Sequence, residues 1–111
     1  DQAYEAWKNL ASNLSTDYPG ADVFTFYHGK VAYDLRDMFE TGELDGDIEK
    51  MTGAKDKSIF TDYKGHAGQI MIDTGTLVWL HAVHGVDPMT MPEFRQWGVD
   101  VRQIAKDSIE A

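Results

Sequence analysis

IMIDTGTLVWLHAVHG, residues 70–85, is the most apolar stretch of the chain and decides its fold. Together with the residues before it, this stretch contains a series of residues spaced alternately three and four positions apart. The series consists of Phe60, Tyr63, Ala67, Ile70, Thr74, Leu77, His81 and His84. Such spacing over several turns is typical of an α-helix. Ser58 is a candidate N-cap, and Gly85 is a natural stop. We therefore predict a central apolar helix over about residues 58–84.

The same stretch also permits a β-hairpin over residues 69–83. Its two flanks, 69–72 and 76–83, are rich in residues that favour strands, and the segment 73–75 can form a turn between them. In either strand, however, apolar residues would fall on both faces, which requires covering layers on both sides of the sheet. The rest of the chain offers few strands for such a sheet. The pattern favours the helix, and an α+β fold with this hairpin is the alternative.

Helical spacing of apolar residues recurs along most of the chain. It predicts helices over residues 2–14, 30–41 and 43–52, whereas residues 22–29 are predicted to form a short strand or an extended linker. A chain of 111 residues fits one domain with a sizeable core. We therefore predict a mainly α protein, in which residues 1–111 form a single compact bundle of about five helices.

A further local pattern lies near the C-terminus. Thr90 and Glu93 have the spacing of a capping box, in which the first side chain caps a helix and the second reaches back to it. Met89 and Phe94 occupy the positions of a hydrophobic staple around this cap. The pattern therefore predicts that the last helix begins at Thr90 and continues to the C-terminus.

Composition narrows the class of protein. The chain has no cysteine, which excludes disulfides, thiolate zinc sites and a cysteine nucleophile. No window has the ~18 uninterrupted apolar residues of a membrane span, so we expect a soluble protein without a membrane span. The first residue is Asp1, and a short polar start of this kind is what signal-peptide cleavage leaves. A processed secreted or periplasmic form is therefore one expectation, although the sequence does not fix the compartment.

Charge points to a class of partner. The formal net charge is −9, from 19 acidic and 10 basic residues, which disfavours direct binding to nucleic acid and attracts basic proteins. One acidic run contains no base between its members: Glu40, Glu43, Asp45, Asp47 and Glu49. We predict that these five residues form the surface of an acidic interaction protein that binds a basic protein partner, as inhibitors, immunity proteins and nucleic-acid mimics do.

The alternative function is that of a helical metal- or small-ligand-binding domain. His81 and His84 are three residues apart, so on a helix both imidazoles can reach one divalent metal, and Asp73 would be a polar group of the pocket. Each residue also has a structural explanation. A helix dipole favours histidine at a helix C-terminus, and a buried aspartate is usually held by structural hydrogen bonds. The segment from Asp45 to Asp56 resembles a calcium loop only in part, because Lys50 stands where that loop needs glycine.

The tetrad Asp73-Thr74-Gly75-Thr76 resembles the catalytic tetrad of aspartic proteases. That resemblance implies a tetrad on a turn between strands, and two such turns that bring paired carboxylates together. Only one copy is present here, and the last part of the chain is predicted to be helical, so the four residues do not predict a protease. No nucleophile–base pair can be assembled from the sequence, which argues against an enzyme.

Overall fold

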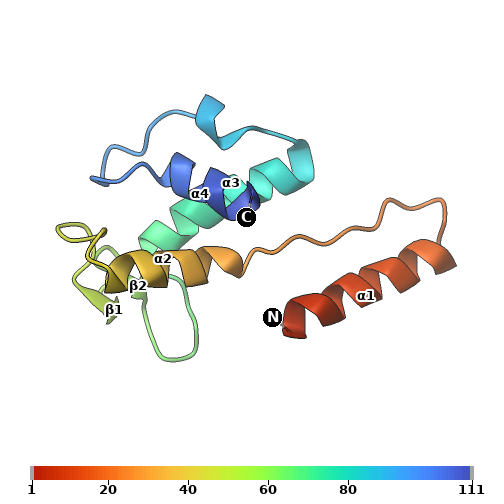
Figure 1. Cartoon of the computed structure of the whole chain (residues 1–111), viewed down its shortest axis with the longest axis horizontal. Coiled ribbons are helices and arrows are strands. Elements are labelled where there is room, and N and C mark those ends of the chain that lie inside the picture. Colours follow the sequence, from red (N-terminus) through yellow and green to blue (C-terminus); the bar gives the residue numbers. More distant parts are fainter. Residues whose placement is uncertain (1, 111) are drawn as a thin grey trace.

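The computed structural model describes residues 2–110. The elements along the chain are α1 (Gln2–Asp17), α2 (Lys30–Glu40), β1 (Lys50–Thr52), β2 (Ser58–Phe60), α3 (Gln69–His84), the 3₁₀ helix η1 (Pro88–Thr90) and α4 (Val101–Glu110). Figure 1 shows α2, α3 and α4 gathered into one body, while α1 lies apart at the end of an extended segment. The mainly helical class is confirmed, but three α-helices and not five make up the packed body.

Helix α3 is the centre of this body, as its apolar pattern predicts. Residues 69–84 are helical throughout, so the hairpin predicted as the alternative over residues 69–83 is wrong. Gly85 ends the helix in the left-handed conformation, with φ of 68°, and its N–H bonds to the His81 carbonyl. Thr74 is tolerated inside the helix because its hydroxyl donates to the Ile70 carbonyl at 2.8 Å.

The first part of the predicted 58–84 helix is wrong. Residues 58–60 form β2, which pairs in parallel with β1 in the register Lys50↔Ser58 and Thr52↔Phe60. The helix begins only after Gly68, whose N–H donates to the Ile59 carbonyl at 2.6 Å. A Cβ atom on Gly68 would lie 1.9 Å from the Ser58 carbonyl oxygen. The close contact of Gly68 with the backbone of β2 therefore keeps residues 61–68 out of the helix.

The C-terminal helix begins about ten residues later than the capping-box pattern predicts. Thr90 ends η1, whose cap is Asp87, and Pro92 holds Met91 extended at ψ of 156°. The cap of α4 is Asp100, whose Oδ1 accepts the backbone N–H of Arg102 at 3.0 Å. The helix predicted over residues 43–52 is also absent, because this segment forms turns and then β1.

The hydrophobic core lies among α2, α3, α4, β2 and the loop that follows α2. Its buried members are Val31, Leu35, Leu44, Ile48, Ile59, Ile70, Leu77, Val78, Val101, Ile104 and Ala105. Helix α1 contributes no buried residue to this core. Within residues 2–110, no helix combines the length and the apolar composition needed to cross a membrane.

Candidate functional site

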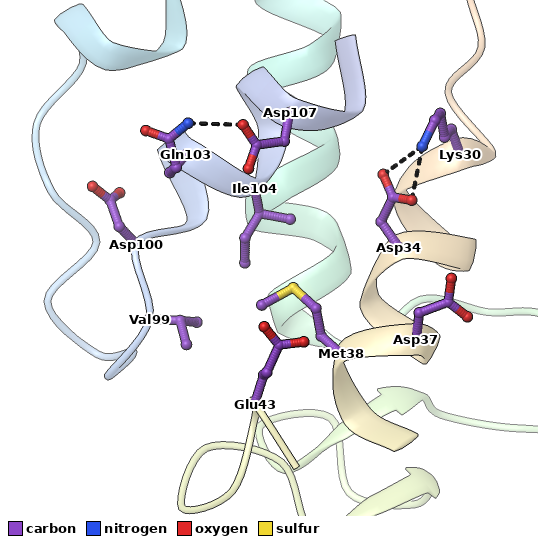
Figure 2. Close-up of a pocket in the computed structure, with 10 residues that line it drawn as sticks. All are labelled: Lys30, Asp34, Asp37, Met38, Glu43, Val99, Asp100, Gln103, Ile104 and Asp107. Carbon is purple, nitrogen blue, oxygen red and sulfur yellow. Dashed lines mark hydrogen bonds and ion pairs between the residues drawn. The ribbon is translucent and has the colours of Figure 1, made fainter. Parts of the chain in front are cut away.

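A groove of about 600 Å³ runs between α2 and α4 (Figure 2). Its walls come from one face of each helix, since the lining residues recur at helical spacing, and from the loops that precede α4 and follow α2. The lining residues are Lys30, Asp34, Asp37, Met38, Glu43, Val99, Asp100, Gln103, Ile104 and Asp107. A volume of this size is typical of a ligand-binding site.

The groove combines an apolar floor with an acidic rim. Met38, Val99 and Ile104 supply the apolar surface, and Figure 2 shows Met38 on α2, Ile104 on α4 and Val99 on the loop before α4. Five carboxylates surround this surface and only one ammonium group accompanies them, that of Lys30. The rim carboxylates are those of Asp34, Asp37, Glu43, Asp100 and Asp107. A cation with an apolar body is the ligand that such a surface complements.

Asp37 forms a 3.6 Å ion pair with Arg36, and two further rim carboxylates have shorter contacts with charged partners. Lys30 Nζ lies 2.8 Å from Asp34 Oδ1, and the Ser108 hydroxyl donates to Asp34 Oδ2 at 2.6 Å. Asp100 accepts hydrogen bonds from Arg102, which lower the pKa of the Asp100 carboxyl below its ordinary value. These two carboxylates hold the walls in place as well as adding charge.

Glu43 and Asp107 differ from the other rim residues in their contacts. Glu43 accepts the Thr41 hydroxyl at 2.7 Å, and Asp107 accepts the Gln103 side-chain amide at 2.8 Å. Both donors are neutral, so these contacts do not cancel the charge of either carboxylate. Glu43 and Asp107 are therefore the rim groups best placed to meet an incoming cation.

The structure separates the five acidic residues predicted as a partner surface. Of these, only Glu43 lines the groove. Glu40 forms a 4.0 Å ion pair with Arg36 on the outside of α2, and Asp47 accepts the Gly98 backbone N–H at 2.8 Å. Asp45 and Glu49 are exposed on the loop between α2 and β1.

Sequence reasoning missed the other four rim carboxylates. Asp34 and Asp37 are three residues apart on α2, and Asp100 and Asp107 are seven apart around α4. Acidic residues at helical spacing beside an apolar position were the available signal. The signal could not show that the two acidic faces meet, because that depends on how the helices pack.

Asp73 is buried inside the body, with 8% of its surface exposed. Its carboxylate accepts three side-chain N–H groups, from Gln69 at 2.7 Å, Gln96 at 2.9 Å and Trp97 at 2.8 Å. These bonds satisfy the charge of a buried carboxylate. Asp73 is also in the middle of a helix, whereas the catalytic aspartate of an aspartic protease requires a turn between strands.

His81 and His84 lie exposed on the last turn of α3, where the helix dipole favours them. They are adjacent on the helix surface, as their spacing predicts. Within residues 2–110, no group of three or more histidine, cysteine, aspartate or glutamate side chains is placed to hold a metal ion. The two imidazoles therefore have no third protein ligand among the described residues.

No family model, curated protein or solved structure matches this chain. Its function is therefore inferred from the chemistry of its own surfaces. The groove between α2 and α4 is the surface with the most definite chemical character, since it pairs apolar and acidic groups within one cavity.

Proposed function

We propose that this protein binds a basic protein partner through the groove between α2 and α4. The observation that supports this proposal is the ring of five carboxylates around an apolar floor. A cationic amphipathic segment would place apolar side chains against Met38, Val99 and Ile104. Its lysine or arginine groups would then meet Glu43 and Asp107. Apolar contact contributes most of the affinity, while the charges orient the partner and raise the rate of association.

The charge of the whole chain supports the same class of partner. A net charge of −9 produces a negative field that attracts basic proteins from a distance and opposes binding to nucleic acids and anionic lipids. The field acts within the screening length of about 8 Å at physiological salt. An inhibitor, immunity protein or nucleic-acid mimic would use such a field together with a shaped contact surface.

A labelled helical peptide made of lysine and leucine is a suitable probe of this groove. We expect the peptide to bind, as measured by fluorescence anisotropy, and to be weakened about tenfold in the double variant Glu43→Gln/Asp107→Asn, since one close charge pair can contribute ~1.4 kcal/mol or more. The matched control is Asp17→Asn/Asp22→Asn, which removes the same charge from exposed positions near the end of α1. The control should change the dissociation constant by no more than about twofold.

Two results would contradict this proposal. Equal weakening by the groove variant and the control would show that only net charge attracts the peptide. An unchanged dissociation constant in Met38→Asp would show that the apolar floor is not used, because a carboxylate placed there should oppose burial of an apolar side chain.

A further inference from the structure

Two helices of this protein carry seams of apolar side chains that stay largely exposed, although Phe26 packs edge-on against Trp79 of the second seam with ring centroids 5.0 Å apart. The α1 seam consists of Ala3, Trp7, Leu10 and Leu14, and the outer seam of α3 consists of Ile72, Thr76, Trp79 and Val83. The two tryptophans are 61% and 52% exposed, respectively. Leu10, Ile72 and Val83 are exposed as well. Large apolar side chains gathered in this way mark an interaction surface.

The two seams match each other in length and spacing. Each has successive steps of four, three and four residues, which is the a/d pattern by which helices pack side by side. Both helices are 16 residues long, and neither seam contains a charged residue. A lone helix of this length is only marginally stable in water, so α1 gains stability from a packing partner.

Helix α1 is held away from the α3 of its own chain. The Tyr4 ring stacks on Tyr27 with centroids 4.4 Å apart, and the Ser15 hydroxyl donates to the Val23 carbonyl at 3.1 Å. Both contacts tie α1 to the extended segment that follows it. A cleft of about 610 Å³, lined by both seam tryptophans, remains between α1 and α3. Figure 1 likewise shows α1 displaced from the body.

We propose that two copies of this chain form a dimer in which the α1 seam of each copy packs along the outer seam of α3 of the other. This exchange keeps the contacts that hold α1 to its own linker and covers both seams in both copies. The pairing is reciprocal, so it closes with twofold symmetry and leaves no seam open for a third copy.

The seam tryptophans supply about two fifths of the area that a specific dimer needs. An aromatic side chain buries ~150–250 Å², and the seam tryptophans are about half exposed, so the four in a dimer contribute roughly 400 Å². Twelve smaller seam residues and the flanking side chains add to this area. A specific interface needs about 1,000 Å² in total.

Salt should change dimerisation through the seams and partner binding in the groove in opposite directions. The seams are uncharged, whereas two copies with a net charge of −9 repel each other. Screening weakens that repulsion, so we expect the dimer to become tighter as salt rises. Peptide binding in the acidic groove should weaken over the same range, so the two surfaces can be tested independently.

The test is the mass of the full chain in solution, measured by sedimentation equilibrium at several concentrations and at physiological salt. We expect the native chain of 12.5 kDa to reach twice that mass at high concentration. Trp7→Glu and Trp79→Glu should each raise the dimer dissociation constant at least tenfold, because a charge would face an apolar seam. Tyr63→Glu is the matched control, since Tyr63 is 96% exposed and lies outside both seams. It should leave the dissociation constant unchanged.

Mixing the two tryptophan variants tests the exchange itself. One contact of the mixed dimer joins two native seams, while the other contact carries both glutamates. We therefore expect the mixture to associate more tightly than either variant alone, with circular dichroism confirming that both remain folded. A native chain that stays monomeric, variants that still dimerise normally, or a mixture no tighter than its components would each overturn the proposal.

Discussion

The indole Nε1 of Trp97 donates a 2.8 Å hydrogen bond to the carboxylate of Asp73, 24 residues earlier in the chain. This bond fastens the irregular segment before α4 to the middle of α3. Gln96 donates to the same carboxylate oxygen at 2.9 Å. A buried carboxylate without hydrogen-bond donors would be costly, so the segment and the helix stabilise each other.

Replacing the indole should therefore weaken the fold. We expect Trp97→Phe to lower the free energy of unfolding by about 1.5–3 kcal/mol, because it removes a hydrogen bond to a charged group. Urea unfolding followed by circular dichroism measures the loss. Trp7→Phe is the matched control, and it should change stability by less than about 0.5 kcal/mol because α1 has no buried residue. Similar losses in both variants would contradict the role given to the Trp97 bond.

The start of α3 should be intolerant of a single methyl group. We expect Gly68→Ala to cost at least about 2 kcal/mol of stability, since its Cβ would lie 1.9 Å from the Ser58 carbonyl oxygen, a rigid backbone atom. Gly20→Ala is the control, because a Cβ there would meet nothing within 4 Å. Thermal unfolding of the two variants makes the comparison. A melting temperature for Gly68→Ala equal to that of the control would show that Gly68 and β2 are not as closely packed as this 1.9 Å distance requires.

His28 should make the protein less stable in mild acid. Burial lowers the pKa of its imidazole, and its ring lies so close to α3 that a Cβ on Gly75 would be 2.7 Å from Cε1. The unfolded chain takes up this proton near pH 6.5, before the folded chain does. The unfolded state therefore binds more protons, and stability falls as the pH drops below about 6.5 until it passes the folded pKa.

The variant His28→Phe isolates this effect. Melting temperatures from pH 7.5 to pH 5 should fall less in the variant than in the native chain, whereas above pH 7 neither chain should gain or lose stability through residue 28. Parallel melting curves over the whole range would show that His28 ionises equally well in the folded and unfolded states.

Zinc provides a direct test of the histidine pair on α3. Because His81 and His84 are exposed and have no third protein ligand among residues 2–110, we expect zinc to raise the melting temperature only slightly. The double variant His81→Ala/His84→Ala should respond in the same way. A large increase that the double variant loses would instead support the metal-binding function, since ligands that bind the folded state stabilise it.

Local sequence determined the parts of this structure that depend on neighbours along the chain. The apolar spacing of residues 69–84 places one face of α3 in the core, and Gly85 ends the helix because glycine readily adopts a left-handed conformation. The acidic balance also follows from composition, because net charge requires no knowledge of the fold.

Tertiary structure decided where several elements begin. The helical spacing that predicts α3 extends back to Phe60 in the sequence, but pairing of β2 with β1 holds residues 58–60 in a strand. The capping pattern at Thr90 and Glu93 is likewise overridden. Pro92 holds the chain extended. The backbone N–H of Gly98 donates to Asp47, and the indole of Trp97 donates to Asp73. Each outcome depends on contacts with residues distant in sequence, which a local pattern does not contain.

The candidate groove was decided by packing in the same way. The run from Glu40 to Glu49 is continuous in sequence, yet only Glu43 reaches the groove. The remaining rim carboxylates come from α2 and from the region of α4, more than sixty residues apart. Charge can be counted from a sequence. A binding surface, however, exists only where packing brings charged groups and an apolar floor together, because both must contact the same partner at once.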